Sequence, residues 1–242
     1  MEEMLRQGAK ELGVTLSDMQ ISQLVRYARL LQEWSQKMNL TAIKDDEGIV
    51  TKHFLDSLSA IKTGYVSGRV IDVGTGAGFP GLVLKIAMPD IELTLLDSLN
   101  KRLTFLKAVC DDLGMDDVEF IHARAEDFAM KAGYRAGFDT VVSRAVAKME
   151  TLAEWCIPYL REGGYFLALK GPAADEEIVG AKRAITIMGG DAPKVIEVQI
   201  PYTDLNHRII CIKKVRQTPM RFPRKKAIAA KLSVEQCYKK RK

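Results

Sequence analysis

The sequence lacks the features that mark several classes of protein. Its four cysteines are scattered, and no C-x-x-C pair suggests a zinc cluster or a disulfide framework, so reduced thiols and no metal are expected. No apolar stretch approaches the roughly 20 residues needed to span a bilayer, and the opening MEEMLRQGAKEL lacks the basic start and apolar run of a signal peptide. We therefore expect a cytoplasmic protein with no membrane partner.

Charge is unevenly distributed along the 242 residues, which carry a net charge of +5. The segment from Lys213 to Lys242 contains twelve Lys and Arg against the single acidic residue Glu235, and residues 1–212 then hold 24 basic and 30 acidic residues. A strongly basic tail on a mildly acidic body has two interpretations. It is a solubilising end, or it binds a polyanion.

The first 68 residues are predicted to form a helical extension. Ser17 and Gln20 make a capping box, and apolar residues then repeat at spacings of three and four up to about Asn39, which predicts an amphipathic helix. A looser helical pattern follows from about Glu47 to Lys62 and contains the stretch HFLDSL.

From Arg69 onward, short apolar strands alternate with helical patterns. The predicted strands are 69–74, 91–97, 118–123, 138–144, 164–170, 194–200 and 208–215, and the predicted helices are 81–88, 100–113, 148–160 and 175–188. Near-continuous apolar strands are typical of sheets that are buried on both faces. We predict an α/β fold with a doubly wound, mostly parallel, seven-stranded Rossmann-like sheet at 69–215, followed by a basic tail at 216–242. The last two strands lack a long helix between them, so they are expected to form an antiparallel edge.

The stretch VIDVGTGAGFPG, residues 70–81, carries two superimposed glycine motifs. Gly76, Gly78 and Gly81 match the dinucleotide pattern G-x-G-x-x-G, whereas Asp72 and Gly74 open the pattern D-x-G-x-G-x-G of S-adenosylmethionine sites. Glycine lets the backbone turn sharply and approach a ligand, although a purely structural turn is the other interpretation.

Three features disfavour a nicotinamide cofactor. Asp72 would repel a pyrophosphate but attract the ammonium of a methionine moiety, and Phe79 adds bulk where a second phosphate would lie. The only Y-x-x-x-K match, the motif of short-chain dehydrogenases, is Tyr238 with Lys242 at the extreme end. S-adenosylmethionine is therefore the favoured cofactor.

Other candidate ligands follow the later strands. Asp97, about 20 residues past the loop, is placed to accept hydrogen bonds from ribose hydroxyls in either cofactor. Ala125 and Glu126 are candidates for reading an adenine edge with a backbone N–H and a carboxylate. For Glu126 the alternative is an acidic residue that stabilises a helix N-terminus.

Arg144 ends a buried strand and is a candidate to bind the carboxylate of the cofactor, a guanine or a phosphate. Its alternative role is a salt bridge to a helix at the end of the sheet. Lys170 is a weaker candidate for a phosphate contact. His53 and Asp56 share one helix face, and we interpret them as a packed histidine with a local partner rather than as site residues.

Six stretches resemble, in order, the RsmG family, also called GidB. They are NLTAI (39–43), HFLDSL (53–58), IDVGTGAGFPG (71–81), LLDSLNKRLTFL (95–106), VVSRAVA (141–147) and LALKG (167–171). The resemblance covers about 200 residues. It implies an S-adenosylmethionine-dependent enzyme that methylates N7 of a guanine in small-subunit (16S) ribosomal RNA. It also implies cofactor contacts from the glycine loop, the A-E pair and the S-R-A segment, namely Gly74, Phe79, Ala125, Glu126 and Arg144.

Guanine N7 carries a free lone pair, so its methylation requires no general base. The chain accordingly lacks the N-P-P-Y or D-P-P-Y segment of exocyclic-amine methyltransferases after its fourth predicted strand. The partner is expected to be ribosomal RNA or the small ribosomal subunit, bound by a monomer through a tail that is mobile until RNA orders it. The candidate tail contacts are Arg221, Arg224, Lys225, Lys226 and Lys231.

Two other functions stay open at this point. One is an RNA-binding protein whose cofactor site is vestigial or regulatory, against which the intact glycine loop argues. The other is a small-molecule methyltransferase, which the basic tail disfavours because such a substrate gains little from many phosphate contacts.

Overall fold

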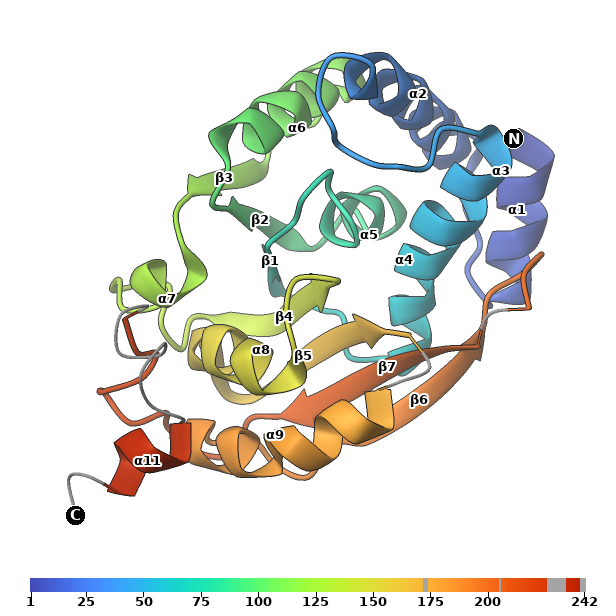
Figure 1. Cartoon of the computed structure of the whole chain (residues 1–242). Coiled ribbons are helices and arrows are strands. Elements are labelled where there is room, and N and C mark those ends of the chain that lie inside the picture. Colours follow the sequence, from blue (N-terminus) through green and yellow to red (C-terminus); the bar gives the residue numbers. More distant parts are fainter. Residues whose placement is uncertain (172–173, 205, 226–233, 240–242) are drawn as a thin grey trace.

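The core of the protein is one seven-stranded sheet (Figure 1). A computed structural model describes residues 1–171, 174–204, 206–225 and 234–239. The strand order is β3-β2-β1-β4-β5-β7-β6. The strands are β1 (Arg69–Val73), β2 (Glu92–Asp97), β3 (Val118–His122), β4 (Phe138–Arg144), β5 (Leu160–Lys170), β6 (Lys194–Gln199) and β7 (Asn206–Lys213).

Strand directions confirm the predicted doubly wound fold. Strands β1 to β5 run parallel, whereas β7 is antiparallel to β5 and β6 is antiparallel to β7. Strand order reverses between β1 and β4, which lie side by side. In open sheets of this type, ligands bind beyond the carboxyl ends of the strands at such a reversal.

Helices cover both faces of the sheet (Figure 1). One face carries α1 (Glu2–Glu11), α2 (Asp18–Ser35), α5 (Gly81–Ala87) and α6 (Asn100–Leu113), and the other carries α8 (Met149–Cys156), the 3-10 turn η3 (Ile157–Tyr159) and α9 (Ala174–Met188). Each face has its own apolar cluster. The N-terminal helices share the first cluster with the sheet, so residues 1–68 have no separate core.

Helix α2 begins as the sequence predicts. The Ser17 hydroxyl accepts from the Gln20 N–H at 3.2 Å, and the Gln20 side chain accepts from the Ser17 N–H at 2.8 Å. Its buried residues include Leu24, Tyr27 and Leu31, which are fully covered. The helix ends at Ser35, before the expected Asn39.

The second predicted helix is a run of unequal helical turns. It consists of α3 (Asp46–Ile49), the π-helical η1 (Val50–Leu55), α4 (Asp56–Leu58) and the 3-10 turn η2 (Ser59–Thr63). The Asp45 side chain caps its start by accepting from the Gly48 N–H at 2.6 Å. π-helical turns often occur at functional sites.

Part of the basic tail packs against the body of the protein. Phe222 is fully buried in the second cluster, and Arg135 donates to backbone carbonyls of Thr218, Pro219 and Phe222. Helix α11 (Val234–Lys239) lies against α9. The expectation of a tail without core contacts is therefore wrong for these residues, because one buried aromatic leaves no periodic pattern in a sequence.

None of the helices in the described ranges combines the length and apolar character needed to cross a membrane.

Candidate active site

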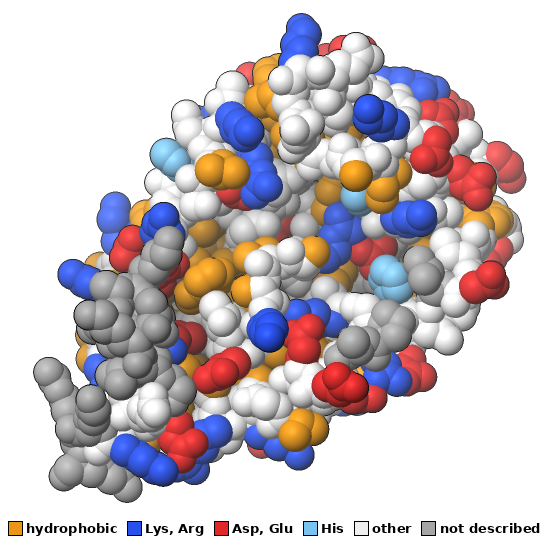
Figure 2. All heavy atoms as spheres, in the orientation of Figure 1, with side chains coloured by type: hydrophobic (Ala, Val, Ile, Leu, Met, Phe, Trp, Pro, Cys, Tyr) orange, Lys and Arg blue, Asp and Glu red, His pale blue; other side chains and the backbone are white. Residues whose placement is uncertain are grey.

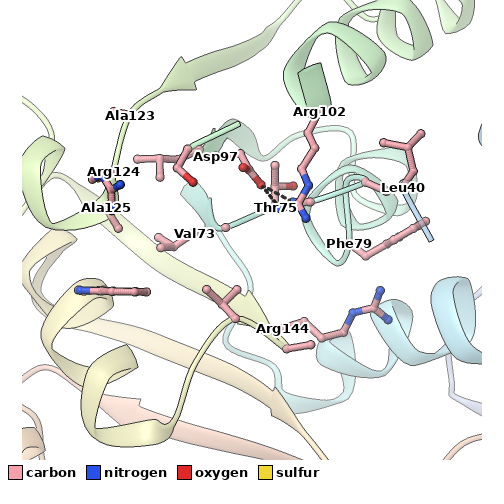
Figure 3. Close-up of a pocket in the computed structure, with 18 of the residues that line it drawn as sticks. Leu40, Val73, Thr75, Phe79, Asp97, Arg102, Ala123, Arg124, Ala125 and Arg144 are labelled. Carbon is pink, nitrogen blue, oxygen red and sulfur yellow. Dashed lines mark hydrogen bonds and ion pairs between the residues drawn. The ribbon is translucent and has the colours of Figure 1, made fainter. Parts of the chain in front are cut away.

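A cavity of about 400 Å³ opens at the carboxyl ends of β1, β2 and β4, where the face shown in Figure 2 is hollowed. Seven of the predicted cofactor residues line it: Gly74, Gly76, Phe79, Asp97, Ala125, Glu126 and Arg144. Figure 3 shows its length, with Ala123 and Ala125 at one end, Thr75 and Asp97 between, and Phe79 and Arg144 at the other.

The glycine loop leaves open space above its backbone. The N–H groups of Gly74 and Thr75 both donate to the Leu96 carbonyl, which fixes the loop to the end of β2. Gly76 has φ of +61°, and a Cβ built on it would meet no atom nearer than the Gly74 carbonyl oxygen at 4.0 Å. The space that a side chain would fill is part of the cavity, so the loop fits a cofactor that approaches the backbone closely.

Asp97 connects the loop to the start of α6. Its carboxylate accepts from the Gly76 N–H at 2.9 Å and from the Leu99 N–H at 2.8 Å, and Arg102 lies 3.2 Å away. The side chain is buried but lines the cavity. A carboxylate has about four acceptor positions, so it can take hydroxyl hydrogen bonds in addition to these.

Asp72 and Gly78 do not line the cavity, which corrects their expected direct contact with the cofactor. The Asp72 carboxylate is fully buried behind the loop and accepts from the Thr75 hydroxyl and the Gly81 N–H, both at 2.8 Å. Burial raises the pKa of Asp72 to about 6, against the effect of these hydrogen bonds. Gly78 faces Tyr27, whose hydroxyl donates to the Ala77 carbonyl. Asp72 and Gly78 therefore support the loop on the side away from the cavity.

The end of the cavity that lies away from Phe79 and Arg144 is formed by the first turn of α7 (Ala125–Phe128). The Tyr159 hydroxyl donates to the Ala125 carbonyl at 2.8 Å and holds this turn to the core. Glu126 is buried, with Arg124 3.9 Å away. The role of Glu126 in reading adenine stays a prediction.

At the other end, Arg144 extends beneath Phe79 toward the helical turns of residues 46–63 (Figure 3). Its guanidinium donates to Asp56 Oδ2 at 2.6 Å, to the Lys52 carbonyl at 2.8 Å and to His53 Nδ1 at 3.2 Å. Arg144 therefore lines the cavity and also forms the salt bridge to a helix that was its alternative role.

Asp56 has a second partner in His207, whose Nδ1 lies 2.5 Å from Oδ1. Burial alone would raise the pKa of Asp56, but the hydrogen bond from His207 and the charge of Arg144 hold that pKa below its usual value. Asp56 is therefore held ionised between two donors.

His53 belongs to the cavity, contrary to its interpretation as a merely packed residue. Its ring stacks on Phe79 with centroids 4.5 Å apart, and its Nε2 lies 2.8 Å from the Thr41 hydroxyl. Burial, together with the charge of Arg144, lowers the pKa of His53 to about 4, so the ring is neutral near pH 7.

Sequence reasoning also missed further residues that line the cavity, including Leu40, Thr41, Arg102, Val146 and Trp155. Four of them lie in stretches that resemble the RsmG family: Leu40 and Thr41 in NLTAI, Arg102 in LLDSLNKRLTFL and Val146 in VVSRAVA.

The remaining predicted contacts lie elsewhere. Lys170 donates to the Ala147 carbonyl and to Glu177 at 2.7 Å, so its ammonium already has a carboxylate partner. Arg224 is buried in an ion pair with Glu154, which does not fit the expected phosphate contact. Arg221 is half-buried, with its guanidinium 4.8 Å from the Tyr238 ring centroid. Lys225 is exposed, and Lys226 and Lys231 lie outside the described residues.

The fold is shared with solved structures of other proteins. A predicted O-methyltransferase from Agrobacterium tumefaciens superposes with a TM-score of 0.53 at 18% identity, covering 68% of this chain and 81% of that one. TrmN from Thermus thermophilus gives 0.51 at 16% identity, covering 69% and 53%. The likeness shows that the chain has a Rossmann-like α/β fold, with the glycine-loop cavity at the carboxyl ends of its parallel strands.

Sequence relatives are much closer. The profile of the GidB family, described as rRNA small subunit methyltransferase G, matches residues 20–206. A protein named ribosomal RNA small subunit methyltransferase G from Alkaliphilus oremlandii is 49% identical over 227 residues, which are 93% of this chain and 95% of the relative. One of the same name from Clostridium novyi is 46% identical over 231 residues, 95% of each. The chain belongs to the GidB family and is an S-adenosylmethionine-dependent methyltransferase.

Proposed function

We propose that the protein transfers the methyl group of S-adenosylmethionine to N7 of a guanine in small-subunit (16S) ribosomal RNA. Membership of the GidB family supports the RNA substrate. The choice of N7 rests on the hydrogen-bond partners of the two titratable side chains beside Arg144, Asp56 and His53. The Asp56 carboxylate is ionised between two donors, and both ring nitrogens of His53 have partners. Because these oxygens and nitrogens already have partners, Asp56 and His53 are poorly placed to take a proton from a base, and methylation at N7 requires no such step.

We propose that the residues that line the cavity bind the cofactor. Asp97 would accept from ribose hydroxyls, Ala125 and Glu126 would face the adenine, and the backbone at Gly74 and Gly76 would border the methionine moiety. When bound, S-adenosylmethionine supplies an electrophilic methyl group on a sulfonium. Transfer of this group to N7, with the carbon–sulfur bond broken as the N7–carbon bond is made, would pass one positive charge to the base and would move no proton.

The Arg144 end of the cavity is suited to this charge transfer. Arg144 and Asp56 form a pair in which Asp56 is buried and Arg144 partly buried, with side chains 3% and 15% exposed. The pair presents directed N–H groups without a net charge, so it can orient a base without opposing the positive charge that develops on it.

RNA contacts beyond the target base are proposed for cationic residues of the tail. Lys225 keeps this role in the tail, as do Lys226 and Lys231 as sequence-based proposals, whereas Arg224 does not. The protein is expected to act as a monomer. Light scattering on the purified protein tests that state. The compartment is expected to be the cytoplasm, where ribosomal subunits are found.

Mapping N7-methylguanine in ribosomal RNA tests the function. Cells that lack the gene should lose the modification at one position, and the wild-type gene should restore it. A Gly76→Val variant, which changes one residue of the cofactor cavity, serves as the matched inactive control. Full modification without the protein would refute the proposal.

A further inference from the structure

A second cavity adjoins the first at the same edge of the sheet. It has a volume of about 330 Å³ and lies where the ends of β4, β5 and β7 meet the helical turns that carry Lys52 and Asp56. His53, Arg144 and Ala145 line both cavities. These three residues therefore form a shared wall at the Arg144 end of the cofactor cavity.

The size and place of this second cavity suit a single base. Small-molecule sites typically begin at about 300 Å³, and enzymes that modify a base commonly take it out of its stack into a pocket. A guanine whose N7 faces the shared wall turns its opposite edge toward the far wall. That edge carries the N1–H and 2-amino donors, whereas adenine has an acceptor at N1 and no 2-amino group.

His207 supplies an acceptor on the far wall. It lines the second cavity but not the first. Its Nδ1 lies 2.5 Å from Asp56 Oδ1, so Nδ1 carries the hydrogen that the carboxylate accepts. In the neutral ring Nε2 is then an acceptor, and it has no partner among the residues that the structure describes.

The far wall and the shared wall are rigidly connected through Asp56. One carboxylate oxygen accepts from His207 and the other accepts from Arg144 at 2.6 Å. Asp56 itself is 2% exposed. The spacing between the two walls is therefore fixed before a base enters, which lowers the cost of ordering the site on binding.

We propose that His207 determines specificity for guanine, with Nε2 accepting a hydrogen bond from the N1–H or 2-amino donor of the target base. This inference rests on the proposed function. Asp56 is the positioning residue that fixes the ring and its tautomer.

Two substitutions separate base reading from a structural role. His207→Gln places an amide oxygen near the position of Nε2, so it keeps an acceptor but loses the donor to Asp56. His207→Asn keeps a donor near Nδ1 and has no group at Nε2. A base-reading residue is replaced better by Gln, whereas a residue that only holds Asp56 is replaced better by Asn.

The experiment measures equilibrium binding of RNA carrying guanosine or adenosine at the mapped position, with S-adenosylhomocysteine present. The wild type should prefer guanosine. His207→Asn should lose roughly 5- to 150-fold of that preference, the usual worth of a contact to a base edge, and His207→Gln should keep most of it. Affinity for S-adenosylmethionine should stay within about twofold of wild type in both variants. His122→Asn, at an exposed histidine outside both cavities, is the matched control.

The outcomes separate the two proposals. Loss of preference in His207→Gln but not in His207→Asn would show that the ring only holds Asp56, and an unchanged preference in both would exclude base reading. Either result overturns this inference while the wild type still methylates guanine N7. A wild type that methylates no guanine N7 in the same preparation overturns the proposed function and the inference with it.

Discussion

Replacing Arg224 with methionine should lower the free energy of unfolding by about 3 kcal/mol, near the lower end of the cost of breaking a buried ion pair. The side chains of Arg224 and Glu154 are 6% and 3% exposed. Arg224 donates to Glu154 from Nε at 2.8 Å and from Nη2 at 2.6 Å. The substitution leaves a buried carboxylate with the backbone N–H of residue 224, which lies 2.6 Å away.

Thermal and denaturant unfolding measure the effect. For a chain of this size each kcal/mol shifts Tm by roughly 2–4 °C, so a fall of about 6–12 °C is expected. Lys225→Met, at the exposed neighbouring residue, should change Tm little. Adding Glu154→Leu to Arg224→Met should recover much of the loss, because the uncompensated charge is then removed.

RNA binding gives an independent measurement. Arg224→Met should leave the salt dependence of RNA affinity unchanged, because the guanidinium is occupied by Glu154. A loss of stability below about 1 kcal/mol, as for an exposed pair, would refute the packed position of this segment. So would a log–log salt slope that is flatter by about 0.7–0.9, the contribution of one phosphate contact.

Four further predictions concern the cavities. Gly76→Val should abolish binding of S-adenosylmethionine in calorimetry while the protein still unfolds cooperatively, because the added carbons fill open space; unchanged affinity would contradict the site. Asp97→Ala should weaken cofactor binding by about 1.5–3 kcal/mol, the worth of hydrogen bonds to a charged group, and a loss too small to resolve would make Asp97 purely structural. The lowered pKa of His53 means that its contribution to stability is present above about pH 6.5 and is lost as pH falls toward 4, by about 3 kcal/mol. His53→Gln should therefore reduce the pH dependence of the free energy of unfolding between pH 6.5 and 4. An equal pH dependence in the wild type and the variant would contradict the lowered pKa of His53. Lys52→Ala, at the mouth of the second cavity, should flatten the salt slope of RNA binding by about 0.7–0.9, whereas the exposed Lys62→Ala should not; equal slopes would exclude a phosphate contact at Lys52.

The parts of the site that the sequence predicted are those formed by local geometry. A glycine loop between a strand and a helix must lie at the carboxyl end of that strand, and residues that end neighbouring parallel strands must meet there. Gly76, Asp97 and Arg144 line the cavity at that edge, as this reasoning predicts, and their contacts with the cofactor stay predictions. The strand boundaries followed from apolar runs and differ from the structure by a few residues.

The parts that the sequence did not predict depend on side-chain direction or on distant contacts. Asp72 lies in the loop motif, but which side of the loop its carboxylate faces is set by packing against Gly81. His53 meets Arg144 across 91 positions, and Arg224 meets Glu154 across 70. No local pattern records such pairs, so the sequence assigned Arg224 to a phosphate contact although its guanidinium is buried against Glu154.

The two cavities differ in how far apart in the sequence their hydrogen-bonded residues lie, which affects the order in which the cavities can form during synthesis. The hydrogen bond between Gly76 and Asp97 joins positions 21 apart, whereas that between Asp56 and His207 joins positions 151 apart. Closing the longer loop costs more entropy, and its second partner emerges from the ribosome only after six of the seven strands. The cofactor loop can therefore reach its final shape on a growing chain, while the far wall of the second cavity is completed near the end of translation.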